Sequence, residues 1–179
     1  ALAAVVWLCA GPAAHLAAGL PRLRDPAAPI PGPIAARYAL HRSKKRRRRF
    51  EDLLEKRRRG IVIVTDRYPQ VETPGLHDGP ILAGAARNPA LQRIQREERA
   101  LYAEMAAYVP TLVIRLSIDI DTAMARKPDH DRALVAMKIA SLPAITFNNA
   151  PMLDLDATMD YGEELARAEA AINAILSKT

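Results

Sequence analysis

The strongest constraint on the fold is the alternation of short hydrophobic runs with longer segments of helix-forming residues. The runs IVIVT (61–65), TLVIRLSI (111–118) and MLDLD (152–156) have the length and composition of strands. Helix-like segments lie before, between and after these runs. Strands that are joined by helical crossovers pair in parallel. The sequence therefore predicts an α/β fold, a parallel sheet with helices on both faces.

The expected helices are marked by their composition and by signals at their ends. Residues 34–59 contain neither Pro nor Gly, and Gly60 stands where a C-cap residue would stand. Asp160, with Glu163 three residues later, has the spacing of a capping box that opens the last helix. The other expected helices lie near 91–108, at 121–127 with Asp119 or Asp121 as its cap, and at 131–142.

For three segments the sequence also predicts burial or loop structure. The run at 61–65 is apolar or β-branched throughout, which is typical of a strand covered on both faces. Residues 66–88 contain several prolines and glycines and are predicted to form a long loop. The last helix is expected to bury an apolar stripe, which consists of Leu165, Ala168, Ile172 and Ile175.

The amino-terminal part differs in composition from the rest. Residues 1–20 are Ala-rich and apolar but lack a basic start and contain Gly11 and Pro12, so we expect a buried or partly buried helix and no targeting segment or membrane span. Residues 12–33 hold six of the fourteen prolines and are expected to form a linker or extended loop. We therefore expect an Ala/Pro-rich segment at 1–33 and an α/β domain at 34–179. The chain begins with Ala, from which we expect a processed or truncated piece.

The net charge of +6 arises from one segment. Between Arg42 and Arg59 there are eleven basic and three acidic residues, a local charge of +8, whereas the other 15 basic and 17 acidic residues sum to −2. This distribution disfavours a protein that coats nucleic acid with its whole surface. The single cysteine, Cys9, excludes a disulfide framework and a Cys-based zinc site, and the four histidines lack metal-binding spacing.

Charged residues follow each expected strand directly. In parallel sheets, ligands bind at the carboxyl ends of the strands, which here are Asp66–Arg67, Asp119–Asp121 and Asp156–Ala157. An Arg at such a place can grip a phosphate with two hydrogen bonds, and an Asp can orient a metal ion or its water. A local Asp66–Arg67 salt bridge that closes a turn before Pro69 accounts for this pair equally well.

Several segments occur in an order that is known from one enzyme family. The basic helix ends in RRRG and leads into IVIVTDRYP, which resembles that family's strand and Asp-Arg-Tyr/His motif. YVPTLVIRLSIDIDTAMARK is similar to its strand, Asp-x-Asp and helix that lead into the lid, and LDLDATMDYGEEL resembles its penultimate strand and adenine-contacting loop. Over about residues 34–177 the chain thus resembles the thymidylate kinases and their relatives among the P-loop nucleoside monophosphate kinases.

The resemblance implies phosphate-binding and catalytic roles at the strand ends. Arg67 would hold the phosphate of the acceptor monophosphate, and Asp66 would bind Mg²⁺ through a water molecule. Arg46, on the preceding helix, would be a second phosphate-binding residue, a role that its basic neighbours from 44 to 49 could also fill. Together with Arg126, Asp66 and Arg67 would form the catalytic set, since phosphoryl transfer depends on positioning and charge neutralisation.

The resemblance also implies a lid and an adenine-binding turn. The lid cations would neutralise charge on the transferring phosphoryl group, and these cations are Arg126, Lys127 and Arg132. The turn formed by Asp156, Ala157 and Thr158 would pack against the adenine of ATP.

The sequence departs from this family in its phosphate loop. The family requires GxxxxGK[ST], whose backbone amides and Lys cradle the donor phosphates. None of the eight glycines here is followed by Lys, and the GxxxxG spacing of Gly79 and Gly84 continues with Ala85 and Ala86. We therefore expect a P-loop kinase-like fold that lacks its first strand and its phosphate loop, and little or no turnover by these 179 residues alone.

The leading hypothesis is a thymidylate kinase-like phosphotransferase that moves the γ-phosphate of ATP to a nucleoside monophosphate, with a dTMP-type acceptor and Mg²⁺. This hypothesis predicts a cytoplasmic protein without membrane association and allows a homodimer.

The first alternative is a kinase-fold module that has no phosphate loop and serves in binding or scaffolding. The second is a nucleic-acid-binding module that uses residues 42–59. We expect nucleic acid to be an unlikely partner, because Phe50 is the only aromatic residue in this segment and a solvated helix explains its charge.

Overall fold

The computed structural model describes residues 4–8 and 24–177 of the chain. It divides into two compact units, which we describe separately. The sheet unit comprises Ala1–Gly11, Glu55–Tyr68 and Val109–Thr179, and the helical unit comprises Pro12–Leu54 and Pro69–Tyr108. The predicted boundary at residue 33, between an Ala/Pro-rich segment and an α/β domain, stays a prediction.

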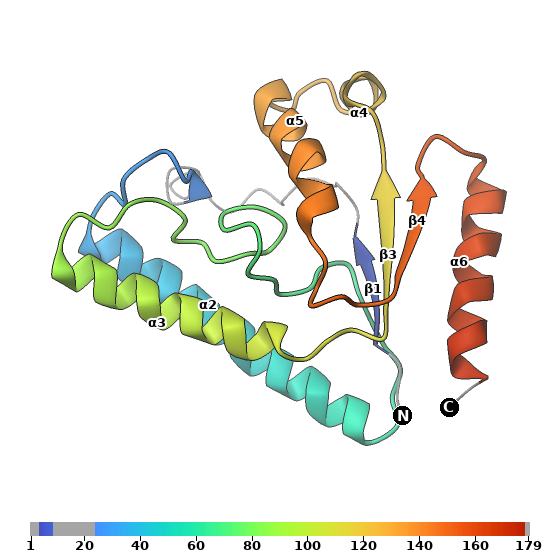
Figure 1. Ribbon diagram of the computed structural model, residues 1–179, viewed down its shortest axis with the longest axis horizontal. Coiled ribbons are helices and arrows are strands. Elements are labelled where there is room, and N and C mark those ends of the chain that lie inside the picture. Colours follow the sequence, from blue (N-terminus) through green and yellow to red (C-terminus); the bar gives the residue numbers. More distant parts are fainter. Residues whose placement is uncertain (1–3, 9–23, 178–179) are drawn as a thin grey trace. The chain divides into compact units, whose positions relative to one another are not determined.

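The described part of the sheet unit contains a four-stranded parallel sheet. Its strands are β1 (Ala4–Leu8), β2 (Ile63–Thr65), β3 (Leu112–Ser117) and β4 (Met152–Asp156), in the order β2-β1-β3-β4. All three strand pairings are parallel, and in Figure 1 the arrows of β1, β3 and β4 point the same way. A mixed α/β fold with a parallel sheet is thereby confirmed.

The amino-terminal strand β1 corrects the sequence prediction. We expected a helix over residues 1–20 and a sheet without its first strand, but Ala4–Leu8 pairs with β2 on one side and with β3 on the other. The consecutive Val5, Val6 and Trp7 favour an extended backbone, and pairing along both edges outweighs the helical preference of the alanines. The remaining residues of the predicted helix and the first part of the predicted linker lie outside the described residues.

Strand β2 lies at an edge of this sheet, which also differs from the prediction. A strand covered on both faces was expected at 61–65, but only Ile63–Thr65 pairs, and the Val64 side chain is 62% exposed. Ile61 and Val62, which precede the pairing, are 49% and 39% exposed. An apolar run at an edge strand has the same composition as one in the centre of a sheet, so the sequence pattern could not separate the two cases.

Helix α6 (Tyr161–Leu176) covers one face of β3 and β4. Leu112, Ile114 and Leu155 form a buried cluster with Ala168, and Ile172 and Ile175 pack against the cluster. The helix begins as predicted, because the Asp160 side chain accepts hydrogen bonds from the backbone N–H groups of Gly162 and Glu163. Leu165, the first member of the expected stripe, is instead 38% exposed.

The opposite face of β3 carries a charged pair. Arg115 and Asp154 are partners in the β3–β4 register, and the guanidinium donates two hydrogen bonds to the carboxylate, one of them 2.9 Å long from Nη2 to Oδ2. Arg115 Nη1 also donates to the Leu142 carbonyl, 3.4 Å away, in the short 3-10 helix η1 (Leu142–Ala144). This helix follows α5 (Arg132–Ser141), and α4 (Ile120–Arg126) precedes α5. The segment after α5 is thus tied to the face that α6 does not cover.

The helical unit contains α2 (Pro33–Arg58), except for the last turn of that helix, and α3 (Pro89–Ala106). Both helices begin with proline, and the side chain of Asn88 caps α3 by accepting from the Leu91 N–H. A buried cluster joins the helices to the loop segments around them, and its members are Ile30, Ala36, Ala39, Ile81, Leu82 and Leu91. Residues 66–88 contain no helix or strand, as predicted.

Candidate functional site

The strand order places a topological switch point at the centre of the sheet. From β1 the chain continues to β2 on one side and then to β3 on the other side of β1. In open parallel sheets, this arrangement leaves a crevice outside the carboxyl ends of the two central strands, where ligands bind. Asp66 and Arg67 follow β2, Asp119 comes after β3, and Asp156 ends β4, so these residues noted in the sequence belong to this edge.

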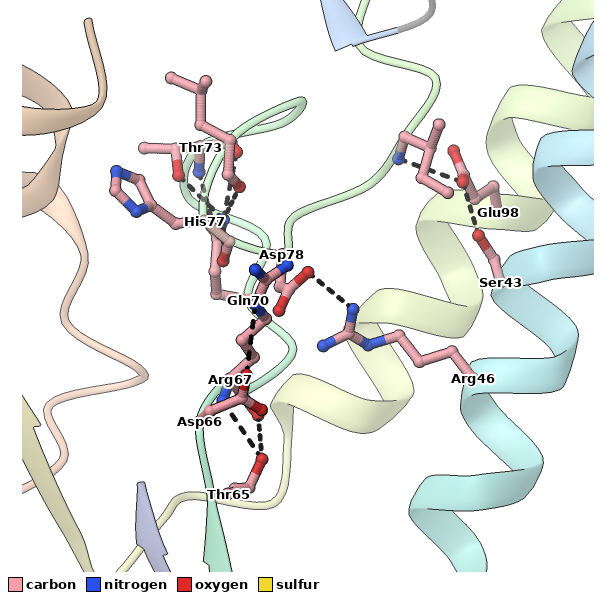
Figure 2. A network of polar contacts seen from close by, with 12 residues as sticks. Ser43, Arg46, Thr65, Asp66, Arg67, Gln70, Thr73, His77, Asp78 and Glu98 are labelled. Carbon is pink, nitrogen blue, oxygen red and sulfur yellow. Dashed lines mark hydrogen bonds and ion pairs between the residues drawn. The ribbon is translucent and has the colours of Figure 1, made fainter. Parts of the chain in front are cut away.

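Asp66 and Arg67 begin the segment after β2 and lie on the surface of the sheet unit. Thr65 fixes this turn, because its hydroxyl donates to the Arg67 carbonyl at 2.6 Å and accepts from the Arg67 N–H at 3.2 Å. The Arg67 Nε lies 3.7 Å from Asp66 Oδ2, with 37% of the Arg67 side chain and 84% of the Asp66 side chain exposed. Figure 2 includes both residues. Asp66 and Arg67 thus form the local ion pair, and both the carboxylate and the guanidinium remain accessible to solvent.

The turn after β4 is tightly hydrogen-bonded. Asp156 Oδ1 accepts from the Thr158 N–H at 2.8 Å and from the Thr158 hydroxyl at 2.7 Å. The Ala157 N–H donates to the Ser117 carbonyl at 2.8 Å, which joins this turn to the end of β3. The Asp156, Ala157 and Thr158 of the predicted adenine turn therefore have a preformed backbone shape.

Asp119 forms a similar local structure at the end of β3. Its carboxylate caps α4, accepting from the Thr122 N–H at 2.8 Å and from the Thr122 hydroxyl at 2.6 Å. These hydrogen bonds lower the pKa of Asp119, and those from Thr158 lower the pKa of Asp156. The negative charge of Asp119 acts in the opposite direction and raises the pKa of Asp156, but the hydrogen bonds from Thr158 outweigh it.

The cations of the predicted lid have different partners. Arg126 donates from Nη2 to the Ala157 carbonyl at 2.9 Å, so the structure brings a predicted lid residue and the predicted adenine turn together. Arg132 pairs with Asp121, 2.7 Å apart, between α5 and α4. Lys127 is the exposed C-cap residue of α4. Of the three, Arg126 is the one that contacts the carboxyl edge of the sheet.

Arg46 belongs to the helical unit, where an acid holds it. Its Nη1 lies 2.9 Å from Asp78 Oδ1, and its guanidinium carbon lies 6.0 Å from the centre of the Tyr102 ring (Figure 2). Burial alone lowers the pKa of Arg46, but the hydrogen bond and the charge of Asp78 outweigh it and the pKa is raised. Burial also raises the pKa of Tyr102. Arg46 is therefore a charged residue that is held by Asp78 beside Tyr102, and 29% of its side chain is exposed.

The loop that carries Asp78 has a strained backbone. His77 and Asp78 both have positive φ angles, 43° and 61°, in the left-handed region that non-glycine residues rarely adopt. The buried Gln70 amide stabilises this conformation by donating to the carbonyls of Thr73 and Leu76, 3.1 and 2.8 Å away. A side chain at Gly79 would lie 2.5 Å from the Thr73 carbonyl oxygen, so the loop also requires glycine there.

Glu98 is an important residue that the sequence analysis missed. It is fully buried in α3 and accepts hydrogen bonds from the Ser43 hydroxyl at 2.7 Å and from the N–H groups of Ile81 and Leu82 at 3.1 and 2.8 Å. Figure 2 shows it between α2 and the loop segment. A signal was present, because Glu98 follows Leu91 by seven residues and Ile94 by four and thus lies on the apolar face of its helix.

Asp66 has the type of side chain that can take part in binding a magnesium ion. Mg²⁺ in proteins commonly has one or two carboxylates together with waters and substrate phosphates as ligands. Asp66 can supply one exposed carboxylate at the strand end. Within residues 4–8 and 24–177, no group of three or more His, Cys, Asp or Glu residues could hold a metal ion by itself.

The chain is homologous to two Escherichia coli proteins. It is 44% identical to "Uncharacterized ATP-binding protein YghS" of strain K12 over 149 residues, which cover 82% of this chain and 63% of YghS. It is 41% identical to "Uncharacterized ATP-binding protein YghR" of strain K12 over 118 residues, which cover 65% of this chain and 47% of YghR. The chain thus spans less than two thirds of the length of these relatives. No protein-family model and no solved structure matches it.

Among the described residues, none of the helices combines the length and the apolar composition that crossing a bilayer requires.

Proposed function

We propose that this chain is part of an ATP-dependent phosphotransferase that resembles the thymidylate kinases and transfers the γ-phosphate of ATP to a nucleoside monophosphate. ATP binding is supported by the names of the two relatives, each called an ATP-binding protein. The acceptor class is supported by the Asp-Arg-Tyr segment after β2, by the lid segment and by the turn after β4.

One observation carries the proposal. The order β2-β1-β3-β4 brings Arg67, the carboxylate of Asp66 and the hydrogen-bonded turn after β4 to the same carboxyl edge of one parallel sheet. The sequence pattern marks each of these groups independently of the strand order. Their occurrence at the edge where parallel sheets bind ligands is what a nucleotide site requires.

In the proposed site, the residues of the chain position the reactants and neutralise charge. Arg67, exposed beside Asp66, binds the acceptor phosphate with its planar group of N–H donors. Arg126 has further N–H donors beyond the one that contacts Ala157, and it neutralises charge on the transferring group. The turn from Asp156 to Thr158 packs against adenine. Asp66 would hold Mg²⁺, which supplies charge neutralisation between the phosphates when bound.

The proposal is tested with the full-length protein and a panel of nucleoside monophosphates. Replacing Arg67 with Ala is expected to lower kcat/KM for the acceptor by orders of magnitude, about 10²-fold or more, because a charge-assisted bidentate contact is lost. Arg167→Ala, at an exposed arginine of α6, is the matched control and should change little. An unchanged kcat/KM in Arg67→Ala would refute the assignment.

A second function is favoured by one sequence feature. The chain has no GxxxxGK[ST] segment, whose amides and Lys bind the donor phosphates in the family it resembles. A kinase-fold module that binds or scaffolds other molecules would not need this segment. Saturable ATP binding in isothermal titration calorimetry argues against this alternative, and its absence together with an absence of phosphoryl transfer supports it.

A further inference from the structure

The basic segment of α2 separates into two sets of cations. On one side the basic side chains are neutralised by acids of the helical unit, with Lys44 2.6 Å from Glu97 and Arg47 3.2 Å from Glu104, both on α3. Arg46 pairs with Asp78. In the sequence these cations belong to one basic segment, but in the structure their charges are neutralised by nearby acids.

The second set lies on the solvent side of α2. Lys45, Arg48 and Arg49 are exposed, Arg42 is half-buried, and none of the four has an ion pair within the described part of the chain. Their spacings of three, four and seven residues place them on one helix face, over about 10 Å of the helix axis. We call these four residues the basic stripe. It ends at Asp52, the next acid on this face.

An aromatic ring extends the basic stripe toward the start of the helix. Tyr38 is 52% exposed and precedes Arg42 by four and Lys45 by seven residues, so it lies on the same face. Phe50, the only aromatic residue within the basic segment, is instead 7% exposed and has edge contact with Tyr108. We expected nucleic acid to be an unlikely partner partly because Phe50 is the only aromatic residue of residues 42–59, and Tyr38, which precedes them, supplies an exposed aromatic ring on the same face.

We propose that the basic stripe and Tyr38 form a docking surface for single-stranded nucleic acid. Cations that lack protein partners on one helix face complement a phosphate backbone, and an exposed tyrosine gives a base a stacking surface. We favour nucleic acid over a lipid bilayer as the occupant, because amphipathic helices bind bilayers through an exposed apolar face. The apolar face of α2, including Ala36, Ala39 and Leu40, is buried within the helical unit. The inference does not depend on the proposed phosphotransferase activity.

The test measures binding of the complete chain to a fluorescein-labelled oligo-dT of about 20 nucleotides by fluorescence anisotropy. Binding should weaken with salt, with a log–log slope near −3 if the four cations of the stripe each contact a phosphate, about −0.7 per contact. The triple variant K45E/R48E/R49E should lose affinity by about tenfold or more. Tyr38→Ala should lose about fivefold, because it removes one stacking surface but no charge.

The matched control reverses the same number of charges elsewhere in the helical unit. Arg93, Arg96 and Arg99 are exposed on α3, and R93E/R96E/R99E changes the net charge by the same amount. Affinity within about twofold of the parent is expected for this control, because direct phosphate contacts and not the total charge determine binding. Circular dichroism verifies folding, and K45Q/R48Q/R49Q replaces the reversal variant if that variant does not fold.

Three outcomes would overturn the inference. The first is an equal loss of affinity in the α2 and α3 triple variants, which would assign binding to net charge. The second is an affinity that does not change with salt. The third is binding to vesicles of phosphatidylcholine and phosphatidylserine that depends on the basic stripe while the oligonucleotide does not bind.

Discussion

The carboxyl edge of the sheet and the loop of the helical unit between Gln70 and Gly84 are stabilised by different kinds of contact. At the sheet edge, exposed carboxylates bond to groups two or three residues away, as Asp119 does to Thr122 and Asp156 to Thr158. In the loop, the buried Glu98 reaches backbone groups 16 and 17 residues away, at Leu82 and Ile81.

The difference between the two regions predicts which substitutions change the free energy of unfolding. A buried polar group that loses its partner is costly, because its remaining partners stay cut off from water. An exposed group that loses a local hydrogen bond is solvated at once. Substitutions in the loop should therefore lower the free energy of unfolding, whereas substitutions at the sheet edge should affect ligand binding and leave stability nearly unchanged.

The largest loss in the free energy of unfolding is expected for Glu98→Ala. This change leaves the Ser43 hydroxyl and the N–H groups of Ile81 and Leu82 without their buried acceptor. The free energy of unfolding, measured by urea denaturation, should fall by about 3–5 kcal/mol. The control Glu97→Ala removes an exposed carboxylate of the same helix that pairs with Lys44, and its effect should stay below about 1 kcal/mol. Equal effects of the two variants would contradict the contrast between the regions.

A slightly smaller effect is expected for Gly84→Ala. A Cβ atom there would lie 1.8 Å from the carbonyl oxygen of Ala28, so the backbone must move. We expect a loss of about 2–4 kcal/mol in the free energy of unfolding. Gly32→Ala is the matched control, because nothing lies within 4 Å of its added Cβ, and this variant should be neutral within about 1 kcal/mol. A neutral Gly84→Ala would show that the loop adapts and is not rigidly packed.

Arg115→Ala tests a pair in the sheet unit that is intermediate between these cases. The Arg115 side chain is 18% exposed, whereas that of Asp154 is 56% exposed. Solvent therefore screens much of the pair, and we expect a loss of about 1–2 kcal/mol, including lost packing of the arginine stem on the sheet. Urea denaturation measures this value, with Arg167→Ala as control. An effect as large as that of Glu98→Ala would show that exposure of one partner does not weaken such a pair.

The smallest effect is expected at Asp156 and depends on pH. Hydrogen bonds from Thr158 lower its pKa below the usual 3.8, so the ionised carboxylate stabilises the folded state. This contribution is present above pH 3.8 and is lost as the pH falls through the lowered pKa. Asp156→Asn should therefore have a slightly lower urea midpoint than the parent at pH 7, and the difference should shrink as the solution is acidified below pH 3.8. A difference that grows on acidification would contradict the claim that the ionised carboxylate of Asp156 stabilises the folded state.

The local parts of the fold could be predicted because their determinants lie close together in sequence. The caps at Asp119 and Asp160, the extent of Met152–Asp156 and the helix at Pro33–Arg58 followed from spacing and composition. The same holds for the residues at the strand ends, because a charged residue that follows an apolar run can be recognised without a structure. Whether these residues bind a nucleotide remains a prediction.

The non-local parts were missed for the opposite reason. The exposed edge position of Val64 depends on which strand lies beside it, and the central position of Ala4–Leu8 depends on its two neighbours. The burial of Glu98 was missed although its place on the apolar face was visible, because its acceptor role depends on a loop that is distant in sequence.

The sequence by itself determined that the sheet is parallel, the extent of Met152–Asp156, the cap of the last helix at Asp160, and which polar residues follow the strands. These properties depend on hydrogen bonds and packing over a few residues. The tertiary structure decided the strand order, the acid that holds Arg46, and which basic residues of α2 have no ion pair with any residue that the structure describes. Such properties depend on contacts between residues that only folding brings together, and a charge is neutralised or left available according to those contacts.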